Sequence, residues 1–149
     1  MPLEYIRPSN LCGLLARYLD ARFVLMHIAY PYQQEVLALG KHYRNVWVDL
    51  CWAWSIDPRT AQEWLRTFLH AAPINKVFDF GGDTHWPTAA TMYALQARRG
   101  IATALAAEVA AGALDEDQAI EVADRIMHRN QYDCFDLSGT RAVLATAAT

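Results

Sequence analysis

The stretch KVFDFGGDTHWP, from Lys76 to Pro87, decides the fold that the sequence predicts. It begins with a short apolar run, KVFDF, which is typical of a buried β-strand, and then changes abruptly to two glycines and an acid. Gly81 and Gly82 allow the backbone to turn sharply and to approach another group closely. Asp83 follows at the point where a strand would lead into a loop. The stretch therefore predicts a buried strand with a carboxylate at its end.

Two further apolar runs precede this stretch. The run RFVLMHI, from Arg22 to Ile28, predicts a strand covered on both faces, and NVWVDL, from Asn45 to Leu50, predicts another. A helical pattern behind a Ser/Asn cap, Ser9–Tyr18, precedes the first run. Two more separate the runs: the segment after Pro31, and a segment with Asp57 as N-cap and Pro58 in its first turn. Apolar strands that alternate with helices pair in parallel through right-handed crossovers. The predicted fold class is α/β.

The rest of the chain is predicted to be helical from Thr88 to Arg129. A break is expected near Gly112, followed by a restart at Asp115, where Gln118 would complete a capping box. The end of the chain, AVLATAAT, is apolar but small, and we predict that residues 138–149 form a flexible tail. The length of 149 residues suits a single domain over residues 1–149.

The composition excludes several classes of protein. Hydrophobic residues make up 54% of the chain and charged residues 19%, which is enough apolar material for a substantial core. The net charge is −3 and no Lys/Arg cluster is present, so a nucleic-acid partner is not expected. Neither a secretory signal nor an apolar run of membrane-spanning length is evident. Cys12, Cys51 and Cys134 form no CxxC pair, which predicts reduced thiols and a cytoplasmic location.

Candidate functional residues follow each predicted strand, because functional groups of parallel α/β proteins gather where strands end. His27 ends the first strand, Asp49 the second, and Asp83 follows the third. A core histidine bonded to backbone is the more frequent use of a residue like His27, and Asp83 is as well suited to capping the next helix. Asp49 is interpreted as a structural hydrogen-bond acceptor. The remaining helical histidines are interpreted as surface residues: His42, His70 and His128.

Other residues near these strand ends have two interpretations each. His85 is close enough to Asp83 in sequence to share a cation, although a simply exposed histidine is more common. Trp52, Trp54 and Trp86 either line a ligand pocket or pack in the core. The DFG letters do not indicate a protein kinase, because the Gly-rich loop, the strand lysine and the catalytic loop are missing.

Three segments resemble, in this order and spacing, a known family. They are FVLMHIAYPYQQEVLALGKHYRNVWVDL, APINKVFDFGGDTHWP and ARRGIATALAAEVAAGALDEDQAIEVADRIMHRNQYDCFDL. Together they are similar to the C-terminal portion of amidohydrolase-related TIM-barrel proteins, a group that includes the FluG-like predicted metal-dependent hydrolases. The most specific parts are the His-x-x-Tyr-Pro-Tyr segment that begins at His27 and the Gly-Gly-Asp turn that ends at Asp83. The resemblance covers the chain from about Asn10 to Leu137.

The resemblance implies a partial TIM barrel, with three parallel βα units that correspond to barrel strands six to eight and C-terminal helices. It implies that His27 faces the metal, or its water and substrate, and that Asp83 binds a divalent metal, Zn above all, and takes a proton from its water. The implied activity is hydrolysis of an amide, ester or related bond, while some relatives perform non-oxidative decarboxylation instead.

The sequence lacks other ligands of the family, since no His-x-His motif occurs in it. An alternative function is therefore a non-catalytic truncated barrel fragment that serves in assembly or binding. A third is a small-molecule-binding α/β module lined by the tryptophans. Apolar strands with an open sheet edge predict association with another copy, or with a partner that supplies the missing strands. The other expected partner is a small-molecule substrate, with no membrane partner.

Overall fold

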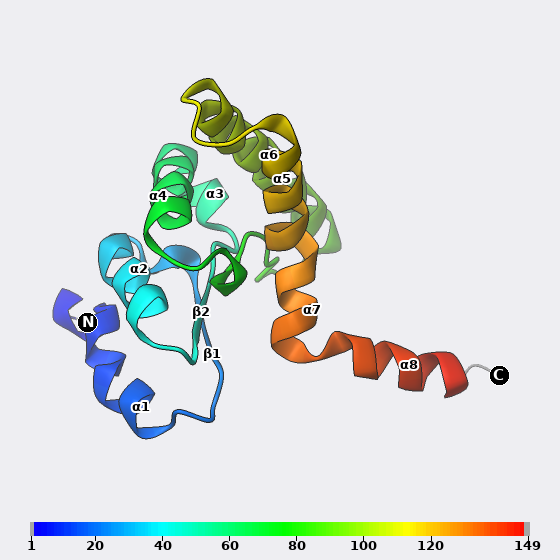
Figure 1. Ribbon diagram of the computed structural model, residues 1–149. Coiled ribbons are helices and arrows are strands. Elements are labelled where there is room, and N and C mark those ends of the chain that lie inside the picture. The colour runs from blue at the N-terminus through cyan, green and yellow to red at the C-terminus, as the bar shows by residue number, and fades with distance from the viewer. Residues whose placement is uncertain (1, 148–149) are drawn as a thin grey trace.

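The computed structural model describes residues 2–147 and contains one three-stranded sheet (Figure 1). The strands lie in the order β1 (Phe23–Met26), β2 (Val46–Asp49) and β3 (Val77–Phe78). Both pairings are parallel, with Val24 opposite Trp47 and Asp49 opposite Phe78. The predicted α/β class is confirmed, and three parallel strands joined by helices are consistent with part of a barrel.

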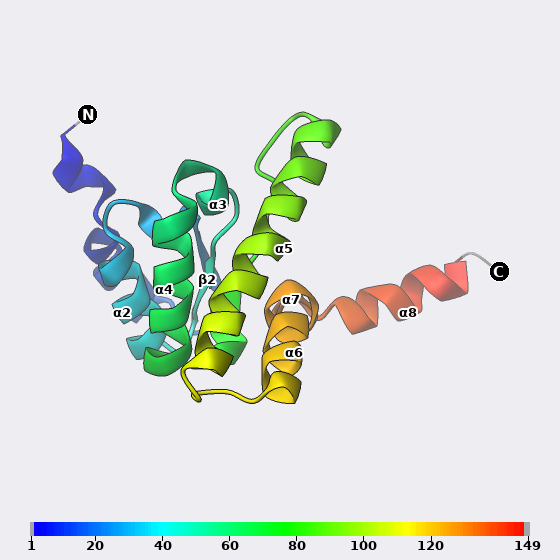
Figure 2. The same cartoon turned by 90° about the horizontal axis from the view of Figure 1, so that it is seen from above.

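Helices occupy the connections between strands and the whole C-terminal part. Those that follow the strands are α2 (Gln33–His42), α3 (Ala53–Ile56), α4 (Pro58–Ala71) and α5 (Pro87–Ala110). Helices α2, α4 and α5 lie side by side in one layer next to the sheet (Figure 2). The C-terminal elements are α6 (Glu116–Asp124), the π-helical turn η5 (Arg125–Arg129), α7 (Asn130–Phe135) and α8 (Leu137–Ala147). The predicted break between α5 and α6 is confirmed.

The core lies between the sheet and this helical layer. In β2, Val46 and Val48 are fully buried, whereas Trp47 and Asp49 alternate with them and are half-buried. The expectation that the first strand is covered on both faces is wrong, because the residues of β1 are only half-buried and Met26 is 44% exposed. The physical reason is position: among the described residues, β1 is an edge strand with a neighbour on one side only.

All three strands are shorter than predicted, and for β1 and β3 the backbone explains why. The first strand ends at Met26, because His27, Ile28 and Ala29 have φ angles of 66°, 48° and 53°. The third strand comprises Val77 and Phe78 rather than the whole KVFDF run. The amide of Asp79 donates to the carbonyl of Ile126 at 3.1 Å, so the chain turns from the sheet towards η5.

The predicted helix caps at Asp57 and Asp115 are confirmed, whereas the α-helix predicted from Ser9 starts at Cys12 with no side-chain cap. The side chain of Asp57 accepts hydrogen bonds from the amides of Arg59 and Thr60, each at 3.1 Å, and Pro58 occupies the first turn of α4. Asp115 and Gln118 form a reciprocal capping box at the start of α6. Both signals lie within four residues of chain, so no tertiary contact is needed to produce them.

Replacement of Asp57 by alanine is expected to lower the free energy of unfolding by about 1 kcal/mol, because two amides at the start of α4 lose their acceptor. Urea denaturation followed by circular dichroism measures this loss. Asp20→Ala is the matched control, since the Asp20 side chain is fully exposed and should change stability by less than about 0.5 kcal/mol. An equal loss in both variants would contradict the capping role.

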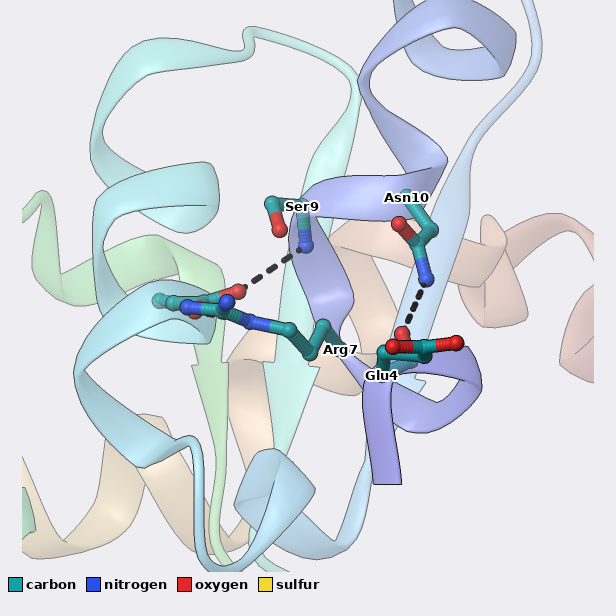
Figure 3. A network of polar contacts seen from close by, with 5 residues as sticks. Glu4, Arg7, Ser9 and Asn10 are labelled. Carbon is teal, nitrogen blue, oxygen red and sulfur yellow. Dashed lines mark hydrogen bonds and ion pairs between the residues drawn. The ribbon is translucent and has the colours of Figure 1, made fainter. Parts of the chain in front are cut away.

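A polar network holds the N-terminal turns against α2 (Figure 3). Arg7 Nη2 lies 2.5 Å from Glu35 Oε1, and the amide of Ser9 donates to Glu35 Oε2 at 3.2 Å. Asn10 Nδ2 donates to the carbonyl of Glu4 at 2.6 Å. The hydrogen bond from Arg7 holds the pKa of the Glu35 carboxyl below its usual value. The turns η1 (Leu3–Ile6) and η2 (Pro8–Leu11) thus lead into α1 (Cys12–Arg17) as part of the fold.

The last described helix, α8, leads away from the rest of the chain (Figure 1), and none of its residues is buried. It occupies most of the segment predicted to be a flexible tail, and its flexibility stays a prediction. Residues 148–149 of that segment lie outside the described residues. No helix within residues 2–147 has both the length and the apolar character needed to cross a membrane.

Candidate functional site

Three loops meet where the parallel strands end. His27 directly follows β1, Cys51 comes two residues after β2, and Asp83 lies in the loop between β3 and α5. One ligand atom from each of these side chains lies within 4.8 Å of the other two. The topology therefore brings the two residues predicted from the sequence, His27 and Asp83, to one rim, together with a cysteine that was not predicted there.

The turn after β1 places the histidine. His27, Ile28 and Ala29 all adopt left-handed backbone angles, which are uncommon for residues other than glycine and strained for a β-branched one. Ile28 is fully buried in the core, and its burial offsets part of that strain. The neighbouring His27 side chain is 33% exposed. The turn thus ends the strand and leaves the imidazole at the rim.

Two side chains contact the same carboxylate oxygen of Asp83, Oδ2. Trp52 Nε1 donates to Oδ2 at 2.6 Å, and His27 Nε2 lies 3.1 Å from it. The rings of His27 and Trp52 are also in tilted contact, with centroids 4.5 Å apart and an interplanar angle of 42°. The Trp52 hydrogen bond, and then the nearby imidazole, hold the pKa of Asp83 below its usual value. Asp83 is therefore ionised at neutral pH and fixed in direction.

The structure does not support the plainer uses weighed for these two residues. The N-cap of α5 is Trp86, whose amide donates to Thr84 Oγ1 at 3.2 Å, and no side-chain bond from Asp83 caps this helix. His27 is not enclosed in the core either, since its ring contacts Asp83 and Trp52 at a partly exposed position.

Cys51 is held at the rim by the end of β2. Its backbone has a φ of 50°, and its amide donates to Asp49 Oδ1 at 2.7 Å. Asp49 thus has the structural acceptor role predicted for it. The thiol of Cys51 donates to the carbonyl of Gly81 at 3.1 Å. A Cβ at Gly81 would lie 3.1 Å from both Cys51 Sγ and Asp49 Oδ2, so a larger residue would push these two side chains away from the third loop.

Burial dominates the electrostatics beneath the rim. It raises the pKa of Asp49 to about 6, although the hydrogen bond from the Cys51 amide opposes the shift. Burial, and then the charge of Asp49, raise the pKa of the Cys51 thiol to about 12. The protein alone therefore keeps this thiol protonated at neutral pH. Asp49 and Cys51 contrast with Asp83, which is exposed and ionised.

Asp79 is a buried acid that sequence reasoning did not single out. Its side chain is fully buried, and neither carboxyl oxygen has a hydrogen-bond partner among the described residues. Burial, and then the charge of Asp49, raise its pKa well above the usual value. The signal that could have identified it is the single acid inside the apolar run KVFDF.

The other candidates lie elsewhere. His85 is exposed and is not one of the three residues whose ligand atoms converge within the described chain. The three tryptophans have separate environments: Trp52 contacts the rim, Trp54 is buried in the core, and Trp86 is 71% exposed. They do not form the common pocket lining on which a ligand-binding module would depend.

The chemistry of the donor set fits a divalent metal. An imidazole nitrogen, a thiol sulfur and a carboxylate oxygen are the three atom types that zinc takes from proteins. Here they come from three neighbouring loops and lie within 4.8 Å of one another. Cys51 was missed because a cysteine after an apolar strand is typical of core packing, and its position at a strand end was the available signal.

Comparisons with known proteins agree with this architecture. The family model described as amidohydrolase matches residues 1–130. Protein fluG of Emericella nidulans is 30% identical to the chain over 133 residues, which are 88% of this chain and 15% of that protein. The chain therefore spans only a small part of the length of this curated relative. Because the family model covers most of its residues, the chain belongs to the amidohydrolase family.

Proposed function

We propose that this chain contributes the rim of a metal-dependent hydrolase site that acts on an amide, ester or related bond. The observation that carries the proposal is the contact of 3.1 Å between His27 Nε2 and Asp83 Oδ2 at the carboxyl ends of parallel strands. Functional groups of barrel enzymes sit at this end of their strands. Membership of the amidohydrolase family supports the same reaction class.

His27 Nε2 and the Asp83 carboxylate would hold the metal. A bound divalent ion supplies a Lewis acid and lowers the pKa of water towards neutrality. Asp83, ionised and oriented by Trp52, accepts the proton of the attacking water and returns it to the leaving group as the scissile bond breaks. Trp52 also restrains the His27 ring by packing against it. The half-exposed positions of His27 and Asp83 leave the rim open to a substrate.

The rest of the barrel wall would come from additional strands. The open side of β1, where Met26 is exposed, is the edge to which another strand can add. We propose that a second copy, or another polypeptide segment, pairs there and completes the substrate pocket.

Metal analysis and a hydrolysis assay together test the proposed function. The chain is grown with Zn, Mn and Fe, freed of loosely bound ions, and assayed with a nitrophenyl ester and a nitroanilide. We expect bound metal and turnover that chelation removes. Asp83→Asn and His27→Ala should each lower turnover by at least about 100-fold, the usual scale for losing a group that transfers protons or holds the catalyst.

The matched control is His42→Ala, because His42 is an exposed histidine at the end of α2. It should keep both metal and turnover. A chain that holds no metal and shows no difference between these variants would contradict the hydrolase proposal. That result would favour the non-catalytic assembly role instead.

A further inference from the structure

The rim contains one more potential ligand than the proposed function uses. Cys51 Sγ, a ring nitrogen of His27 and a carboxylate oxygen of Asp83 all lie within 4.8 Å of one another. Each belongs to a different βα connection, and the three connections follow three adjacent strands. A shared ion is the simplest occupant that would use all three donor atoms at once.

The spacing suits tetrahedral coordination with little movement. Zinc bonds of about 2.0 Å to nitrogen or oxygen and about 2.3 Å to sulfur place neighbouring ligand atoms about 3.3–3.7 Å apart. His27 Nε2 and Asp83 Oδ2 are already 3.1 Å apart. The widest separation within the cluster, up to 4.8 Å, needs to close by about 1 Å, which rotation of exposed side chains can supply.

The position of Cys51 is built by its surroundings. The Asp49 carboxylate holds the Cys51 amide at 2.7 Å and thereby keeps its backbone in the left-handed region. Gly81 leaves room for the sulfur, since a Cβ there would lie 3.1 Å from Sγ. Strain of this kind costs free energy and is found most often at functional sites. Core packing alone would not require a cysteine in this conformation.

We propose that Cys51 is a third protein ligand, and that this chain by itself binds a thiophilic divalent cation through His27, Cys51 and Asp83. The inference rests on the proposed function, since the two share His27 and Asp83. It adds a sulfur ligand and a selectivity: Zn²⁺ and Co²⁺ should bind in preference to Mg²⁺ and Mn²⁺, because thiolate is a soft donor. Three protein ligands leave a fourth position for water or substrate.

The surrounding residues supply what such a centre needs outside its ligands. Trp52 Nε1 donates to Asp83 Oδ2 at 2.6 Å and so orients the carboxylate. A thiolate and a carboxylate balance the charge of a divalent cation, with neutral His27 as the third donor. Binding displaces the thiol proton that Cys51 now donates to the Gly81 carbonyl. The ion also replaces the direct contact between His27 and Asp83.

Cobalt titration of the reduced full chain tests the third ligand directly. We expect the intense visible bands of tetrahedral Co²⁺ and a near-ultraviolet charge-transfer band from thiolate to cobalt. Cys51→Ser should remove the thiolate band and weaken Zn²⁺ binding by at least about 100-fold, since loss of a mere supporting residue already costs 10–100-fold. Cys12→Ser is the matched control, because Cys12 is a half-buried cysteine away from the rim, and it should retain the band.

If Cys51→Ser fails to fold, X-ray absorption of the zinc-loaded wild-type chain shows directly whether sulfur is a zinc ligand. One sulfur at about 2.3 Å from zinc is expected. The absence of sulfur from the zinc shell, or a thiolate band that persists in Cys51→Ser, would overturn the third ligand. If the metal then still depends on His27 and Asp83, the proposed function survives. If no variant or wild-type chain binds metal, both proposals fail.

Discussion

Replacement of Gly100 by alanine is expected to lower the free energy of unfolding by about 2–3 kcal/mol. Gly100 lies inside α5 against the indole of Trp54, and an added Cβ would be 2.3 Å from Cζ3 and 2.4 Å from Cε3. The ring cannot easily move away, because Trp54 is fully buried and its Nε1 donates to the Asp79 carbonyl at 3.1 Å. Overpacking a tight core outweighs the gain in helix propensity of up to about 1 kcal/mol.

Gly13→Ala provides the matched control for this prediction. Gly13 is also a helical glycine, in α1, but it is exposed and a Cβ there would meet nothing within 4 Å. Alanine at Gly13 should therefore leave stability unchanged or raise it by up to about 1 kcal/mol. Urea denaturation of both variants measures the difference. If Gly100→Ala is as stable as Gly13→Ala, α5 does not pack on Trp54 as described.

Replacement of Asp79 by asparagine is expected to stabilise the protein at neutral pH, on the order of 1–3 kcal/mol. Asp79 is fully buried without a side-chain partner among the described residues, and burial raises its pKa well above the usual value. When the pKa of an acid is higher in the folded than in the unfolded state, its contribution to the free energy of unfolding is fully present below the unfolded pKa of about 3.9. That contribution is lost as the pH rises towards the folded pKa. Asparagine cannot ionise, so the variant does not lose this free energy of unfolding as the pH rises.

The pH dependence of urea unfolding separates this effect from simple packing. Below about pH 4 the Asp79→Asn variant and the wild type should be equally stable, and the advantage of the variant should grow as pH rises. Part of the wild-type slope will persist, because the pKa of Asp49 is also raised, to about 6. Asp20→Asn, at a fully exposed position, should follow the wild type at every pH. A variant that is less stable than the wild type at pH 7 would mean that the Asp79 carboxylate is stabilised by a donor.

The elements that could be predicted from the sequence depend on local signals. The caps at Asp57 and Asp115 act within their own first turns, and the three apolar runs identify the strands. The strand ends could not be predicted in the same way. β1 stops where three residues after Met26 turn left-handed, and β3 stops where Asp79 bonds to η5, more than 40 residues further along the chain.

The residues at the rim likewise fall into those that could be predicted from the sequence and those that could not. That His27 and Asp83 lie together follows from parallel topology, because both come after strands, and this was accessible from the sequence. The approach of Cys51 was not accessible, since it depends on Gly81 packing against the second loop. Their roles in metal binding and catalysis stay predictions.

The contacts between helices could not be predicted from the sequence either. His70 was interpreted as a surface residue, and its side chain is indeed largely exposed, but its Nε2 lies 2.6 Å from Glu108 Oε2. Arg66 Nε lies 2.5 Å from the other oxygen of Glu108, whose side chain is only 2% exposed. Helical periodicity places these residues on α4 and α5 without showing that the two faces meet. A buried glutamate is stable here because the guanidinium of Arg66 and the imidazole of His70, both on the neighbouring helix, bond to its two oxygens.

The outer edge of β1 also governs how the isolated chain behaves when it is concentrated. A four-residue strand of Phe, Val, Leu and Met has, within residues 2–147, a hydrogen-bonded neighbour on one side alone. The unpaired peptide groups on its other side can form hydrogen bonds with strands of other copies of the chain. Burial of its apolar side chains makes such β-sheet aggregation favourable. During refolding from denaturant, packing of this strand therefore competes with aggregation. Dilution favours the native state, because aggregation between chains depends on protein concentration and folding within one chain does not.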